Sequence, residues 1–163
     1  MRRTVRFATG LASAVMVILF AVSCDDDDDI TGLGDPTYTA TLLATNEIPP
    51  TATTGTGTAT FEDRGTQIDW ALTVTGLTAI VDSHIHLGSA TQNGGIIINL
   101  FTPRVATGPV NGLLGTGTIT AANNANVSLD SLRVLFNNGN SYVNVHTSAN
   151  PGGAIRGQVA PSP

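Results

Sequence analysis

Lysine is absent from this chain of 163 residues, and cysteine occurs once, at Cys24. The chain therefore has no lysine amine for covalent catalysis and cannot form an internal disulfide. Aromatic residues make up 5% of the sequence, with one Trp and two Tyr, which leaves few flat surfaces for stacking sugar rings. These absences disfavour a carbohydrate-active enzyme and a disulfide-stabilised scaffold.

Motifs for hydrolysis are also missing. No Gly-x-Ser-x-Gly elbow occurs, and the run Asp82-Ser83-His84 is the only stretch with the residue types of a catalytic triad. In a strand, Ser83 would project from the face opposite to Asp82 and His84, so His84 could not activate it. We assign no catalytic residue and expect a non-enzymatic protein.

The N-terminus has the pattern of a secretory signal. Arg2, Arg3 and Arg6 precede an apolar run from Phe7 to Val22, which is short for a membrane span. The following Ala21-Val22-Ser23-Cys24 resembles a bacterial lipobox, with Ala21 in place of the usual Leu. We expect residues 1–23 to be a lipoprotein signal peptide and Cys24 to be lipidated. A plain signal peptide or an uncleaved anchor are the alternatives.

Five consecutive aspartates, Asp25 to Asp29, follow the cysteine. Such a run of like charge cannot pack, so residues 24–36 are expected to be a lipidated, solvated tether. The expected location is extracytoplasmic, on a bacterial membrane, with the outer membrane or cell surface favoured over the inner membrane. The membrane, reached through the lipid, is then one partner.

Removal of residues 1–23 leaves four Arg and twelve Asp or Glu, a formal charge of 4 − 12 = −8. A lysine-free acidic chain repels phosphate backbones, so no nucleic-acid partner is expected.

Residues 37–163 suit one all-β domain, an antiparallel β-sandwich or Greek-key barrel with one short helix. Ile68, Trp70, Leu72 and Val74 alternate with polar or small residues, which places Trp70 in the core. The expected strands share this alternation or a β-branched composition: 38–43, 56–61, 68–74, 81–87, 96–100, 115–121, 142–146 and 154–159.

The expected helix has Ser128 as its N-cap and ends near Gly139. Its apolar residues Leu129, Leu132, Leu135 and Phe136 are spaced for one face, which would cover one end of the sheet.

Three motifs recur in an order typical of one family. They are His84-Ile85-His86, the strand Tyr142 to Thr147, and the close Gly152 to Gln158, with Asn46 to Pro50 upstream. Together they resemble the CHRD domain, named after chordin and common in bacterial exported proteins, over Tyr38 to Val159. The resemblance implies the β fold, an exported location and a pattern that includes the histidines; its usual Glu is Ala154 here.

All three histidines are candidates for one site. His84 and His86 share a strand face, as do Tyr142, Asn144 and His146 on the later strand. Ile85, Leu87, Val143 and Val145 would then face the core. Two imidazoles at i and i+2, plus a third from a neighbouring strand, form a typical copper or zinc site. Similar local spacing occurs in copper/zinc superoxide dismutase, which carries a His-x-His strand outside a β-barrel.

Four further residues could hold these rings or contact a ligand: Glu47, Asp82, Asn144 and Arg156. We expect Arg156 to pair with an acidic side chain such as Glu47. A structural polar network without metal is the alternative to a metal site. The sequence therefore favours a binding or envelope-structural module, with an envelope or extracellular protein as partner, and a copper- or zinc-binding protein as the alternative function.

Overall fold

The computed structural model describes residue 35 and residues 37–101 and 108–163. Cys24, the predicted signal peptide and the acidic run lie outside the described residues. Within the described part the chain forms β-strands, one α-helix (α1, Leu129–Asn137) and a short 3-10 helix (η1, Ala44–Asn46). The strands are β1 (Thr37–Leu43), β2 (Thr56–Asp63), β3 (Gln67–Leu77), β4 (Ile80–Leu87), β5 (Ile96–Phe101), β6 (Val110–Thr120), β7 (Ser141–Thr147), β8 (Ile155–Gln158) and β9 (Ala160–Pro161).

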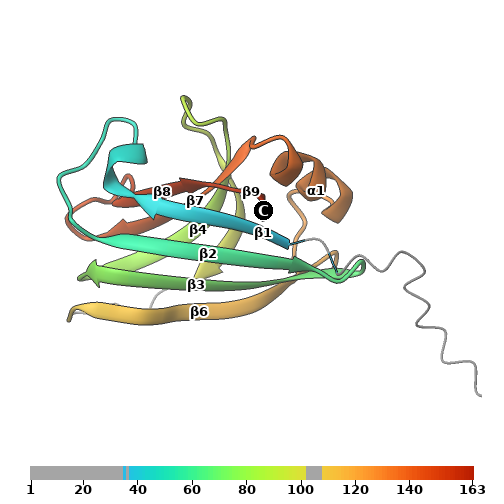
Figure 1. The fold of residues 1–163 in the computed structure, drawn as a ribbon, viewed down its shortest axis with the longest axis horizontal. Coiled ribbons are helices and arrows are strands. Elements are labelled where there is room, and N and C mark those ends of the chain that lie inside the picture. The colour runs from blue at the N-terminus through green and yellow to red at the C-terminus, as the bar shows by residue number, and fades with distance from the viewer. Residues whose placement is uncertain (1–34, 36, 102–107) are drawn as a thin grey trace, which may run out of the picture. The chain divides into compact units, whose positions relative to one another are not determined.

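All strands belong to one antiparallel sheet that curls into a nearly closed barrel (Figure 1). The order is β5-β4-β7-β8-β1-β2-β3-β6, and β9 pairs with β1. The described residues of β5 and β6, at the two ends of this order, are not paired with each other. The expected all-β class with one short helix is confirmed.

The core follows from strict alternation along the strands. In β3, Ile68, Leu72 and Val74 are at most 1% exposed, and Trp70 is 9% exposed. The Trp70 indole lies against Gly117 of β6, its partner in the register. A Cβ built on Gly117 would lie 2.9 Å from the indole ring, so only glycine leaves room for it. Trp70 is thus a core residue, as its strand pattern predicts.

Helix α1 covers the end of the sheet where β1 begins (Figure 1). The Ser128 hydroxyl accepts the N–H of Ser131, which makes it the expected N-cap. Leu132 and Phe136 are fully buried, and the Phe136 ring packs against Tyr38 at 5.1 Å between centroids. No helix among the described residues is long and apolar enough to span a membrane.

The structure differs from the predicted elements at several edges. Strand β6 begins at Val110, five residues earlier than expected, and β9 and η1 were not predicted. Leu87, expected on the core side with Ile85, is 46% exposed at the end of β4. The early part of β6 escapes prediction because its register with β3 shifts at Leu72 and Thr73, which interrupts alternation.

A partly buried ion pair attaches α1 to the end of β2 and the turn that follows it. Arg133 donates to both carboxylate oxygens of Asp63, at 2.6 and 2.8 Å, and also to the Gly65 carbonyl. The Asp63 side chain is 6% exposed. Hydrogen bonds from Arg133 hold the pKa of Asp63 below its usual range, against the opposing effect of burial. The pair therefore stabilises the fold most when Asp63 is ionised.

We expect Arg133→Met to lower the free energy of unfolding by about 1.5–3 kcal/mol at pH 7, the range for hydrogen bonds to charged groups. Because the folded pKa of Asp63 is lowered, the difference between wild type and variant is full above the unfolded value of about 3.9. It shrinks as the pH falls through the folded pKa. Urea unfolding at pH 7 and at pH 3 measures the size of the difference and its pH dependence. The control is Arg64→Met, which removes an exposed arginine, 47% exposed at its side chain, and should leave the stability almost unchanged because exposed ion pairs contribute little. If the stability difference between the wild type and Arg133→Met did not change with pH, the ion pair between Arg133 and ionised Asp63 would not be its cause.

Candidate metal centre on strands β4 and β7

The pairing of β4 with β7 brings the three histidines together. Asp82 lies opposite His146, His84 opposite Asn144, and His86 opposite Tyr142. Since alternate residues of a strand share a face, all these side chains project from one side of the two strands. Ile85, Val143 and Val145 project into the core on the other side and are fully buried.

The imidazoles form one buried cluster. His84, His86 and His146 are each 7–8% exposed. The Nδ1 of His84 lies 3.1 Å from the Nε2 of His146. One ring nitrogen from each of the three lies within 4.8 Å of the others. The clustering of the three rings is therefore present in the fold, as expected from strand parity for His84 and His86 and from the resemblance to the CHRD domain for His146.

Each ring is held on its outer side by an oxygen. The Nδ1 of His86 lies 2.9 Å from the Gly94 carbonyl, and the Nδ1 of His146 lies 3.0 Å from the Pro151 carbonyl. A carbonyl oxygen can only accept, so each Nδ1 carries the proton and donates it. The Nε2 of His84 lies 3.1 Å from a carboxylate oxygen of Asp82, which assigns its proton to Nε2 in the same way.

Three unprotonated nitrogens are left facing inward when the rings are neutral. They are Nδ1 of His84, Nε2 of His86 and Nε2 of His146. The first and third face each other at 3.1 Å, and two lone pairs at that distance repel unless a cation lies between them. The Nε2 of His86 is buried and has no hydrogen-bond partner among the described residues, which is a costly arrangement for a polar atom.

Burial favours the neutral form of His86 and of His146. Desolvation lowers the pKa of His86, and the neighbouring His146, His84 and Arg156 lower it further, while the Gly94 carbonyl opposes them. Desolvation also lowers the pKa of His146; His84 adds to this effect, and the Pro151 carbonyl and Asp82 oppose it. Neutral imidazoles with inward lone pairs are the form in which histidine binds metals.

Asp82 holds a ring as expected, but Asn144 does not. The Asn144 amide donates weakly to Glu47, at 3.4 Å, and contacts no histidine nitrogen. The Oδ1 of Asn144 and the Oε1 of Glu47 are both buried without a partner among the described residues. Burial raises the pKa of Glu47 to about 7, against the lowering effects of Arg156 and Asn144. A proton on Glu47 would therefore supply the donor that these two acceptors lack.

The expected pairing of Arg156 with Glu47 is wrong as a direct contact. Arg156 is 1% exposed, and its guanidinium donates to Asn93 Oδ1 and to the carbonyls of Ser89 and Gln92, at 2.6–2.9 Å. Glu47 acts on it only through its charge. Three neutral oxygens of one loop satisfy this buried cation in place of a carboxylate.

Two ring-holding groups, the carbonyls of Gly94 and Pro151, were not predicted. Every residue carries a carbonyl, so sequence offers no direct signal for them. The indirect signal is their turn chemistry: Gly94 precedes another glycine, and Pro151 precedes Gly152-Gly153. Both turns follow a histidine-bearing strand.

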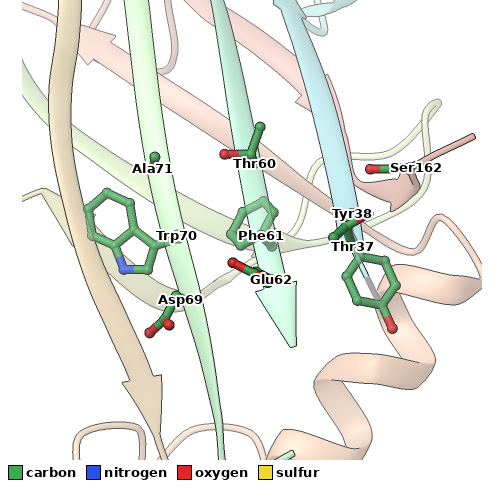
Figure 2. A pocket seen from close by; sticks show the side chains of 9 residues that line it. All are labelled: Thr37, Tyr38, Thr60, Phe61, Glu62, Asp69, Trp70, Ala71 and Ser162. Atoms are coloured by element: carbon green, nitrogen blue, oxygen red, sulfur yellow. The ribbon is translucent and has the colours of Figure 1, made fainter. Parts of the chain in front are cut away.

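A hollow of about 520 Å³ lies over β1, β2 and β3 and is an alternative location for a site (Figure 2). Its carboxylates already have partners. Glu62 lies 2.7 Å from Arg64, and Asp69 accepts from Gln67 and Thr118. None of its lining residues has a buried side-chain polar atom without a partner. The hollow therefore offers no buried, unpartnered polar group for a ligand, whereas the histidine cluster does.

Comparison with models of known protein families matches residues 38–159 to the CHRD domain. Comparison with curated proteins finds no significant match. The matched range contains all three histidines and Glu47, Asp82, Asn144 and Arg156. Because it also spans most of the chain, the protein belongs to the CHRD domain family.

Proposed function

We propose that this protein is a lipid-anchored, extracytoplasmic binding module whose CHRD domain binds one copper or zinc ion through His84, His86 and His146. The observation that carries the proposal is the set of three inward lone pairs, each on a ring held from behind by an oxygen. Metal-binding histidines typically donate their other N–H to a carboxylate or carbonyl in this way.

The spacing of the nitrogens is compatible with a shared ion after a small adjustment. Metal–nitrogen bonds of about 2.1 Å allow two ligands to lie at most about 4.2 Å apart. The 3.1 Å pair meets this limit. One ring nitrogen from each histidine lies within 4.8 Å of the others, so a small inward shift of the rings suffices to bring all three within this limit. Imidazoles bind both ions, and the usual affinity order favours Cu²⁺ over Zn²⁺.

The experiment is metal titration of protein purified without a histidine tag and stripped with a chelator. We expect one equivalent of Cu²⁺ or Zn²⁺ to bind to the wild type. Because metal binds the folded state, a free concentration one hundred times Kd should stabilise the fold by about 2.7 kcal/mol. The variant His146→Asn should lose both the stoichiometric binding and the stabilisation.

Thr58→Ala is the matched control, since Thr58 is exposed on β2 and distant in the sheet order from β4 and β7. It should bind metal as the wild type does. If the wild type binds no more metal than His146→Asn, the cluster is a structural polar network with a shared proton between His84 and His146. The domain would then act as an envelope-structural or protein-binding module.

A further inference from the structure

One metal-site ring is part of a stack of three flat groups. The Tyr142 ring lies parallel to the His86 ring, with 5.0 Å between centroids and 11° between planes. The Arg156 guanidinium carbon lies 3.4 Å from the centroid of the Tyr142 ring. Because β4 and β8 flank β7 on opposite sides, His86 and Arg156 approach Tyr142 from opposite sides. Tyr142 is 2% exposed, so the stack is shielded from water. Its order is His86, Tyr142, Arg156.

The strand register builds this stack. His86 on β4 lies opposite Tyr142 on β7, and Asn144, two residues further along β7, lies opposite Arg156 on β8. A cation over a phenol ring is favourable, and burial strengthens it. The parallel contact restricts the tilt of the His86 ring, whose Nε2 is the unpartnered nitrogen.

The β4–β5 loop, residues 88–95, forms hydrogen bonds with all three groups of the stack. Gly94 donates its N–H to the Tyr142 hydroxyl at 3.2 Å, and its carbonyl accepts from Nδ1 of His86. A Cβ on Gly94 would lie 1.7 Å from the Leu87 carbonyl, so only glycine fits there. One residue thus fixes the tyrosine hydroxyl and the histidine tautomer together.

Arg156 fixes the loop itself. Its planar fork donates to Ser89, Gln92 and Asn93, all within the 88–95 loop. A lysine in this place has one ammonium group and no planar fork, so it could not reproduce these contacts and the stack together. The position of the Gly94 carbonyl, and with it the Nδ1 proton of His86, therefore depends on Arg156.

We propose that Tyr142 and Arg156 are positioning residues for His86: they set its tautomer and ring plane so that Nε2 faces the other two histidines. The proposal deepens the metal-binding function and rests on it for its consequence in affinity. Groups that orient a ligand in this way typically change metal affinity by about 10- to 100-fold when removed.

The experiment combines an apo measurement with a metal measurement on the same variants. In ¹⁵N-labelled, metal-free wild type, NMR of the ring nitrogens should show His86 as a single tautomer with the proton on Nδ1. Arg156→Lys keeps the charge and should produce a mixture of His86 tautomers. Its Cu²⁺ affinity should fall by about 10- to 100-fold, while His146 keeps its Nδ1 tautomer.

Tyr142→Phe is the milder companion variant, because it keeps the ring stack and removes only the hydroxyl contact to Gly94. It keeps the test decisive if Arg156→Lys does not fold. We expect it to keep the fold, to loosen the His86 tautomer and to weaken Cu²⁺ binding less than Tyr142→Leu does. The proposal would be overturned if Tyr142→Phe and Tyr142→Leu both fold and both keep the wild-type NMR signals of His86 and the wild-type affinity for Cu²⁺.

The two proposals fail in different ways. If the wild type binds no Cu²⁺, metal binding is wrong, and the tautomer signals alone decide whether Tyr142 and Arg156 position His86. If the wild type binds Cu²⁺ and the variants change neither signals nor affinity, metal binding stands and positioning is wrong.

Discussion

Trp70→Ala is expected to lower the free energy of unfolding by about 3–5 kcal/mol, the range for removing a large aromatic side chain from a core. Trp70 is 9% exposed in the core. Its indole fills the space above Gly117, so truncation leaves a cavity, and Gly117 has no side chain that could fill it. Urea unfolding followed by circular dichroism, which needs no tryptophan signal, measures the loss.

Val134→Ala is the control, because Val134 is 57% exposed on α1. Its effect should stay within about 0.5 kcal/mol, as for most surface substitutions. Gly117→Ala should also destabilise, since its Cβ would approach the indole ring to 2.9 Å. A loss below about 1 kcal/mol for Trp70→Ala would mean that the indole does not fill the core as described.

Cys24→Ser is expected to move the protein from the membrane fraction to the soluble fraction. The proposed anchor depends on one thioether, because Cys24 is the only cysteine of the chain. Several acyl chains on that residue suffice for stable anchoring, whereas one chain binds a membrane only marginally. Serine cannot form the thioether, so the change in fractionation should be nearly complete.

The single cysteine also gives an independent measurement. A lipidated Cys24 has no free thiol, so the denatured wild-type protein should not react with a maleimide and should incorporate labelled palmitate. The control is Thr31→Ala in the tether, which should fractionate as the wild type does. Membrane association that persists in Cys24→Ser, or a reactive thiol in the wild type, would contradict lipidation.

Much of the β domain could be predicted because the alternation of apolar and polar residues along a strand is visible in the sequence. Ile68, Trp70, Leu72 and Val74 fix the faces of β3, and His84 and His86 share a face by the same rule. The pairing of β4 with β7, which brings His146 to His84, came from the resemblance to the CHRD domain. Alternation within each strand does not specify which strands are neighbours.

The surroundings of the histidines could not be predicted, for a physical reason. Opposite charges in the sequence favour an ion pair between Arg156 and Glu47, yet Arg156 is satisfied by oxygens of the 88–95 loop. The carbonyls of Gly94 and Pro151 accept from the Nδ1 atoms of His86 and His146. Their positions depend on the conformation of the loops and not on which side chain the residue carries, so the sequence does not reveal them. Leu87 becomes exposed because β4 ends there and the chain leaves the sheet.

The pairing of β4 with β7 has a consequence for the order in which folding and metal binding occur. His84 and His146 are separated by 62 residues, and such distant contacts form only once the loop between them has closed. A newly made or unfolded chain therefore offers the His84-x-His86 pair alone, without the third ring. Under the proposed function, the ion is acquired after folding, so the compartment in which the protein folds determines which metal it receives.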